Sequence, residues 1–162
     1  MNKPKRSSSE FSSPKQTSDA TRQQLEKSST DHANQEQQAL ALINGGRLTD
    51  AESLYRELIE SGSKSHTAYG NLGVILKMKG DLKNAIMYFK KAIQINPNFP
   101  DAHNNLGVSL QEQSNPNAAI TSYNTAIKLK PNYPEAHYNL GNALQKQGDL
   151  STAISSYKTA LE

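Results

Sequence analysis

The chain has no cysteine and no tryptophan among its 162 residues, and aromatic residues make up only 6% of it. Without cysteine there is no disulfide framework, thiolate zinc site, iron–sulfur cluster or cysteine nucleophile. No apolar run approaches the roughly 20 residues that a membrane-spanning helix needs, and the basic N-terminus lacks the apolar stretch of a secretion signal. The sequence therefore predicts a cytoplasmic protein with no membrane partner.

An excess of charge of one sign is also lacking. The 18 Lys and Arg residues face 15 Asp and Glu residues, a net charge of +3, and residues 1–31 carry +2 of it, with six bases and four acids. A nucleic-acid-binding surface needs a concentrated basic stripe, which this sequence does not contain. We therefore expect no nucleic-acid partner.

The first 31 residues contain eight serines, and their apolar side chains are Met1, Phe11, Ala20 and Leu25. So few apolar groups cannot compensate for the entropy lost when a backbone is ordered. The composition predicts a disordered Ser/Lys-rich tail over residues 1–31. A short helix around residues 21–29 stays open, although no periodicity supports it. The tail is either a solubilising leader or a segment for phosphorylation.

The rest of the chain repeats itself every 34 residues. The tripeptide Asn-Leu-Gly begins at Asn71, Asn105 and Asn139, and residues 100–128 match residues 134–162 at 15 of 29 positions. A fixed period of this length is typical of repeat architectures.

Each period contains two helical patterns. In the first, apolar or small residues recur at i, i+3, i+4 and i+7, as in Tyr69, Leu72, Gly73 and Leu76. The second carries Ala, Ile, an aromatic residue and Ala at helical spacing. Breaks with helix-ending and capping residues separate the two, at Gly80-Asp81, Ser114-Asn115-Pro116 and Gly148-Asp149. Pro97 and Pro131 close the second helices because proline cannot continue a helix.

Small residues at fixed positions predict how the two helices pack. Gly73, Gly107 and Gly141 allow the helix axes to approach, and an aromatic residue of the second helix fills the gap that remains. Those aromatic residues are Phe89, Tyr123 and Tyr157. Neither helix can bury its apolar face alone, so neighbouring units must stack into an αα solenoid.

These residues resemble the tetratricopeptide repeat, with its large residue, Leu-Gly, Ala, aromatic, Ala and Pro at fixed offsets. The resemblance divides the chain into repeats at 32–65, 66–99, 100–133 and 134–162, the last of them truncated. The sequence departs from the pattern at His103 and Ser114, and Gln38-Ala39 replaces Leu-Gly in a degenerate first repeat. The resemblance implies an all-α, right-handed superhelical solenoid with three good repeats and one degenerate N-terminal repeat.

Catalytic chemistry is not indicated. His103 and His137 fall on neighbouring first helices at least about 8–10 Å apart, and no carboxylate pair completes a zinc site, so we expect structural roles for them. Asp101 and Glu135 fall in first helical turns, where negative charge is favoured. No phosphate-binding loop or Gly-x-Ser-x-Gly motif is present. We expect no catalytic residue, no metal, no cofactor and no enzymatic activity.

The resemblance further implies that the first helix of each repeat lines a concave groove that binds a protein or peptide. The candidate peptide-binding residues are Asn71, Asn104, Asn105, Gln111, Tyr138, Asn139, Asn142 and Gln145. An Asn side chain donates and accepts hydrogen bonds, so it can pair with the main chain of an extended peptide. Asn71, Asn105 and Asn139 would form a ladder similar to that in the repeat arm of O-linked N-acetylglucosamine transferases. The alternative is that these Asn residues brace the next helix.

Two hypotheses for the whole chain follow. The first is a protein–protein interaction scaffold that holds an extended partner segment. The alternative is the N-terminal, substrate-recruiting part of a larger glycosyltransferase or sulfotransferase whose catalytic domain is absent from this chain. Ile154 and Leu161 sit in core positions of the last repeat, with no capping helix after them. That end face therefore predicts a homo-oligomer through the C-terminal repeat, compatible with either hypothesis.

Overall fold

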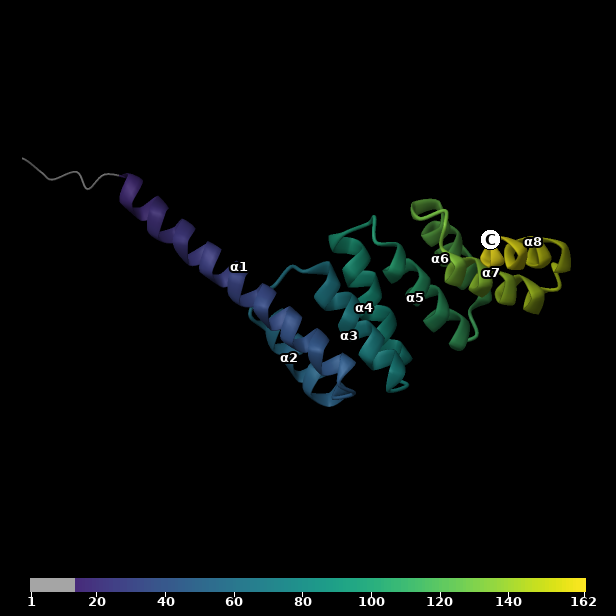
Figure 1. Ribbon diagram of the computed structural model, residues 1–162, viewed down its shortest axis with the longest axis horizontal. Coiled ribbons are helices and arrows are strands. Elements are labelled where there is room, and N and C mark those ends of the chain that lie inside the picture. Colours follow the sequence, from purple (N-terminus) through teal and green to yellow (C-terminus); the bar gives the residue numbers. More distant parts are fainter. Residues whose placement is uncertain (1–13) are drawn as a thin grey trace, which may run out of the picture. The chain divides into compact units, whose positions relative to one another are not determined.

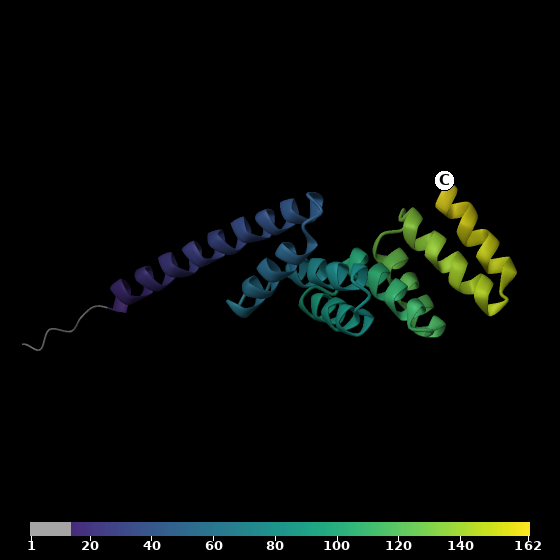
Figure 2. The same cartoon turned by 90° about the horizontal axis from the view of Figure 1, so that it is seen from below.

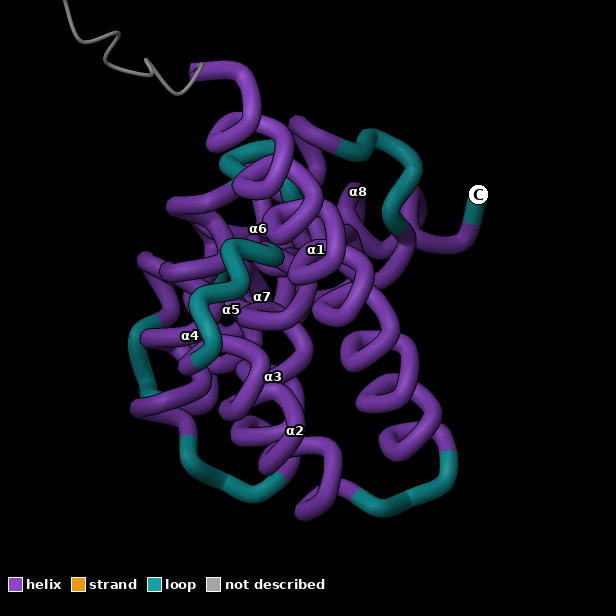
Figure 3. Tube along the Cα trace, turned by 90° about the vertical axis from the view of Figure 1, so that its left-hand side faces the viewer, coloured by secondary structure: helices purple, strands orange, loops and turns teal. Residues whose placement is uncertain are grey.

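A computed structural model describes residues 14–162, which form eight helices and no strand (Figure 1). The helices are α1 (Pro14–Asn44), α2 (Leu48–Glu60), α3 (His66–Met78), α4 (Leu82–Ile95), α5 (Pro100–Glu112), α6 (Pro116–Leu129), α7 (Pro134–Gln147) and α8 (Leu150–Leu161). Short loops join them (Figure 3). None of the described helices combines the length and the apolarity of a membrane span.

Consecutive helices from residue 66 onward pack in pairs: α3 with α4, α5 with α6, and α7 with α8. Each pair falls within one 34-residue period. The second helix of a pair packs on the first helix of the next, α4 on α5 and α6 on α7, which stacks the hairpins (Figure 2). The all-α solenoid predicted from the sequence is confirmed.

The first helix departs from the sequence prediction. Helix α1 already begins at Pro14, where disorder was expected to last until residue 31; residues 1–13 of that predicted tail lie outside the described residues. Residues up to Asn34 form a unit separate from residues 35–162. Gln, Glu, Lys and Ala in this segment favour a helix without a core, and the Nε of Arg22 lies 3.0 Å from Glu26 Oε1 one turn away. The prediction weighed burial alone and neglected intrinsic helix propensity.

The last turns of α1 carry the weak first repeat. Ala39 is fully buried in one apolar cluster with Ala51, Tyr55 and Leu58 of α2. The same cluster continues into α3 and α4 through Leu72 and other residues. This degenerate repeat therefore shares its core with the repeat that follows it.

The predicted caps form at three helix starts. The Oδ1 atoms of Asp81, Asn115 and Asp149 accept hydrogen bonds from backbone N–H groups three residues later, at 3.2, 3.4 and 3.2 Å. The preceding turn needs a left-handed residue, which Gly148 supplies with φ of 87°. In the middle repeat Ser114 occupies this place with φ of 61°, a conformation that costs energy for a residue with a Cβ atom.

The predicted close approach within each hairpin is confirmed. A Cβ atom on Gly107 would lie 2.5 Å from Cε1 of Tyr123, and one on Gly73 would lie 2.7 Å from Cε1 of Phe89. Phe89 and Tyr123 are almost completely buried. Glycine is therefore required here for space, because its missing side chain is the volume that the ring fills.

Candidate functional site

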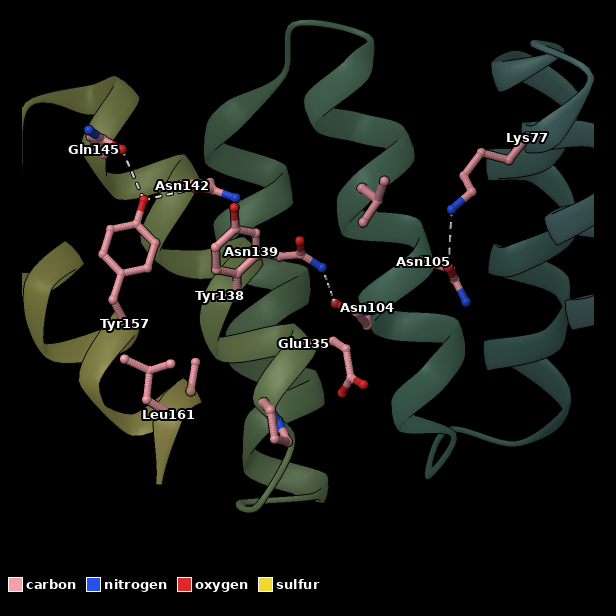
Figure 4. A pocket seen from close by; sticks show the side chains of 13 residues that line it. Lys77, Asn104, Asn105, Glu135, Tyr138, Asn139, Asn142, Gln145, Tyr157 and Leu161 are labelled. Carbon is pink, nitrogen blue, oxygen red and sulfur yellow. Dashed lines mark hydrogen bonds between the residues drawn. The ribbon is translucent and has the colours of Figure 1, made fainter.

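The main hollow of the stacked repeats lies across the groove helices α3, α5 and α7 and reaches the last turn of α8 (Figure 4). We call it the amide groove, after the four asparagines and one glutamine in its wall. Its volume is about 910 Å³. Its lining residues are Lys77, Asn104, Asn105, Val108, Pro134, Glu135, Tyr138, Asn139, Asn142, Gln145, Tyr157, Ala160 and Leu161.

Six of the eight predicted site residues line this groove: Asn104, Asn105, Tyr138, Asn139, Asn142 and Gln145. Gln111 lines a smaller neighbouring hollow of about 150 Å³, and Asn71 lines neither of the two. The structure therefore gathers the predicted residues of α5 and α7 and leaves Asn71 of α3 apart from them. The residue of α3 that lines the groove is Lys77.

Each asparagine of the predicted ladder makes one hydrogen bond to another part of the protein. Asn71 Nδ2 donates to the Tyr55 hydroxyl at 2.9 Å. Asn105 Oδ1 accepts from Lys77 Nζ at 3.5 Å. Asn139 Nδ2 donates at 3.0 Å to Asn104 Oδ1 on the neighbouring groove helix. Half of the amide thus braces the fold at Asn71 and Asn139, and the longer contact of Asn105 is weaker.

The other half of each amide reaches solvent. Within residues 14–162, no intramolecular hydrogen bond involves Asn105 Nδ2 or Asn139 Oδ1, and every buried side-chain nitrogen or oxygen has a partner. These two atoms are therefore accessible, one as a donor and one as an acceptor. Bracing and an open ladder, posed as alternatives by the sequence, are compatible in one side chain.

Tyrosines of the second helices contact amides in the walls of both hollows, Tyr157 in the amide groove and Tyr123 in the smaller hollow. The Tyr123 hydroxyl donates to Gln111 Oε1 at 3.0 Å, and the Tyr157 hydroxyl lies 2.8 Å from Asn142 Oδ1 and 2.9 Å from Gln145 Oε1 (Figure 4). A hydroxyl has one hydrogen, so Tyr157 donates to one of these two amides at a time. The tyrosines orient the amides that face the groove.

The first good repeat lacks this contact. Phe89 occupies the place of Tyr123 and Tyr157 and has no hydroxyl, and Lys77 stands where the other two repeats have Gln111 and Gln145. In the three good repeats the aromatic hydroxyl and the glutamine are therefore either both present or both replaced. This paired change along the 34-residue period can be seen in the sequence.

Tyr138 is an exposed aromatic side chain of the groove. Its relative exposure is 56%, and its ring centroid lies 5.8 Å from that of Tyr157 with the planes tilted by 51°. Sequence analysis had assigned Tyr157 to core packing alone. The structure gives this ring a second role as the support of Tyr138, because the pair forms one aromatic surface in the groove (Figure 4).

A buried tyrosine joins the start of α7 to the first turn of α5. The Tyr133 hydroxyl donates to Asp101 Oδ1 at 2.7 Å. Burial, followed by the carboxylates of Asp101 and Glu135, raises the pKa of Tyr133 well above its ordinary value, so the hydroxyl stays protonated and keeps donating. Asp101 is thus a structural acceptor.

The histidines also have structural contacts. His103 Nε2 lies 3.1 Å from the carbonyl oxygen of Pro97, and His137 Nε2 lies 2.9 Å from that of Pro131. Each ring ties the start of a groove helix to the turn before it. In the described range, no three His, Asp or Glu side chains are grouped in a way that could hold a metal ion.

Family models agree with the 34-residue repeat. Models described as tetratricopeptide repeat match residues 66–99, 88–121 and 136–162, and one described as TPR repeat matches residues 112–148. Residues 66–162 therefore consist of tetratricopeptide repeats. These four matches do not reach the first repeat expected at 32–65. A search of curated proteins gives no match to the sequence.

Solved structures of similar fold include a crystal structure of MamA, with 24% identity and a TM-score of 0.76 over 86% of this chain and 82% of that chain. The structure of MamA residues 41-end from Desulfovibrio magneticus RS-1 is 19% identical, with a TM-score of 0.73 over 80% of this chain and 73% of that chain. The structure of PilF of Pseudomonas aeruginosa is 19% identical, with a TM-score of 0.72 over 78% of this chain and 58% of that chain. At these identities the likeness shows the fold alone.

Proposed function

We propose that this chain is a protein-interaction scaffold that binds an extended segment of a partner protein in the amide groove. The observation that carries the proposal is the set of half-open amides on neighbouring groove helices. Asn105 presents a donor and Asn139 an acceptor. An extended main chain offers N–H and C=O groups in alternation, so such side chains can hold it whatever its sequence.

The aromatic surface supplies the apolar part of the same site. Tyr138 has few rotatable bonds, so it loses little conformational entropy when a partner side chain packs on it. Its support by Tyr157 keeps the ring in one place, and Val108 extends the surface toward α5. We propose no catalytic role for the groove, because its wall contains no nucleophile beside a base.

Selection from a displayed library of random peptides tests this function. Peptides enriched on the full chain should lose at least about tenfold in affinity on the variant Asn105→Ala with Tyr138→Ala, because these side chains make only weak or solvent-exposed internal contacts. Fluorescence anisotropy measures the affinity, and circular dichroism verifies an unchanged melting curve. Asn132→Ala, an exposed asparagine in a turn outside the groove wall, is the matched control.

Asn139→Ala is a poorer test of binding. It would leave the Oδ1 atom of Asn104, which is 7% exposed, without its hydrogen bond, and so would lower stability as well as affinity. If enriched peptides bind the Asn105 and Tyr138 double variant as tightly as the unchanged chain, the groove is not their site and the proposal fails.

A second proposal assigns the same groove to part of a larger enzyme. The chain would be the substrate-recruiting part of a larger glycosyltransferase or sulfotransferase. The three asparagines at one phase of consecutive groove helices favour it, since they resemble the ladder of O-linked N-acetylglucosamine transferases. Reading the gene beyond the codon for Glu162 tests it: an open frame into an α/β catalytic domain supports it, and a stop codon rejects it.

A further inference from the structure

The amide groove contains one cation and one anion. Among its lining residues these are Lys77 near the end of α3 and Glu135 in the first turn of α7. The ion pairs of the described residues involve Arg22, Arg47, Arg56 and Lys79 with their acidic partners, so neither Lys77 nor Glu135 takes part in one. Both charges are available to a ligand.

No aromatic hydroxyl holds Lys77 against the wall. In the two later repeats a tyrosine hydroxyl contacts the glutamine at this position. Phe89 has no hydroxyl, and the side chain of Lys77 extends across toward α5 and makes a long contact of 3.5 Å with Asn105 Oδ1 (Figure 4). A contact of this length is weak and is readily exchanged for a carboxylate.

Helix stability alone does not explain this pair of charges. A base near the end of a helix and an acid near its start are each favourable. The equivalent positions of the other groove helices near their ends, however, are the neutral Gln111 and Gln145. The basic side chain at this position occurs only in the repeat whose aromatic residue has no hydroxyl.

Glu135 lies in the middle of the groove wall, below Asn104 in Figure 4, and the ammonium of Lys77 reaches Asn105 on α5. One helix-to-helix step of about 8–10 Å separates α5 from α7, and four residues, at about 1.5 Å each, separate Glu135 from Asn139, which is in phase with Asn105. The diagonal between the two charges is therefore about 10–12 Å, which is the length of about three residues of extended chain.

We infer that the partner segment is charge-polarised: an extended stretch with an acidic side chain at Lys77, a basic side chain at Glu135, and about two uncharged residues between them. This inference rests on the proposed function of the groove. The amides and Tyr138 then hold the uncharged residues of the segment, and the two charges set which way it lies.

Four blocked synthetic peptides test the polarity. The first two are seven-residue peptides of Ser, Thr and Tyr that also contain one Asp and one Lys three positions apart, in the two possible orders. The third has Ser in place of both charged residues, and the fourth has Asp and Lys adjacent. The full chain should bind one of the two polarised orders about three- to tenfold more tightly than the third and fourth peptides, an advantage that falls with added salt.

A charge exchange in the protein provides the decisive comparison. In the variant Lys77→Glu with Glu135→Lys, the preference between the two orders should reverse. In Lys77→Gln with Glu135→Gln, which perturbs the helix ends less, the preference should disappear. Lys90→Glu with Glu60→Lys changes two exposed charges outside the groove wall at the same net charge, and should keep the original preference.

The outcomes separate the inference from the function on which it rests. A reversed preference with unchanged binding of the uncharged peptide supports both. Equal binding of all four peptides, or a preference that survives the charge exchange, overturns the polarity while binding in the groove stands. No measurable binding of any peptide to the unchanged chain, together with no enrichment from the random library, overturns both.

Discussion

Gly107 on α5 lies so close to Tyr123 on α6 that a Cβ atom would come within 2.5 Å of the ring carbon Cε1. The same relationship joins Gly141 to Tyr157, again at 2.5 Å. The ring fills the space that the missing side chain leaves, and its hydroxyl emerges at the groove wall. Packing of the hairpin and orientation of the groove amides therefore depend on one residue pair per repeat.

Gly107→Ala should lower the free energy of unfolding by about 1–3 kcal/mol, because a rigid buried ring must move to admit the methyl group. The usual effect of this change within a helix is a gain of about 1 kcal/mol. Urea unfolding followed by circular dichroism measures it. Tyr123→Leu removes the clash, so the double variant should lose less free energy of unfolding than the two single variants lose in total. A more stable single variant would contradict the prediction.

Ser114→Gly should raise the free energy of unfolding by about 0.5–1 kcal/mol, since Ser114 has a φ of 61° and glycine adopts this conformation without a steric penalty. Gly148→Ser is the reciprocal variant, because a Cβ atom there meets nothing within 4 Å and only the backbone changes. It should destabilise by a similar amount. Thermal unfolding compares the two, and shifts of the same sign would show that the turn conformation is not the cause.

Gln111→Lys introduces the residue that the first good repeat has at this position. It should lower the free energy of unfolding by about 0.5–1.5 kcal/mol, because the buried Tyr123 hydroxyl loses its acceptor. In a Tyr123→Phe background the same change should leave the free energy of unfolding almost unchanged. A double-mutant cycle by urea unfolding measures the coupling. If Gln111→Lys costs equally in both backgrounds, the hydroxyl–amide contact does not orient the groove wall.

Alkaline titration should show tyrosines that ionise late. Burial raises the pKa values of Tyr55, Tyr123 and Tyr133 above the ordinary value near 10. The folded state then holds these protons more tightly than the unfolded state, so their contribution to stability is complete below pH 10 and declines as the pH rises above it. Tyrosinate absorbance and the unfolded fraction should therefore rise together as the pH increases. In Tyr123→Phe the free energy of unfolding should decrease less steeply with pH. Seven tyrosines titrating near pH 10 in the folded protein would refute this.

The outer face of the last repeat should support self-association. Ile154 and Leu161 are 54% and 90% exposed, and an apolar surface of this kind gains free energy when a second copy covers it. Sedimentation velocity over a range of concentrations should show a dimer that Ile154→Ser with Leu161→Ser removes. A single monomeric species at every concentration would rule out this interface.

Much of the fold could be predicted because it depends on local sequence patterns. The 34-residue period, the caps at Asp81 and Asp149 and the glycine at position 107 each follow from short-range chemistry that the repeat presents three times. The N-terminal helix was left open only over residues 21–29, because its cause is weak helix propensity summed over many residues, which has no periodic signature.

The candidate site was predictable only in part. Asn104 and Asn139 were identified individually, but their hydrogen bond joins residues 35 apart, and a one-residue offset from the repeat period brings them together. Tyr157 was taken as core, because a sequence does not show where a hydroxyl at the end of a buried ring emerges.

Periodicity in the amino acids decided the helices, their pairing and the stacking of the pairs, since each apolar stripe can be buried only against the next copy of itself. Which polar side chains share one hollow was decided only in the tertiary structure. Stacking sets residues from separate repeats side by side at distances of a few ångströms, and hydrogen bonds such as that of Lys77 with Asn105 depend on those distances. They do not depend on the order of residues along the chain.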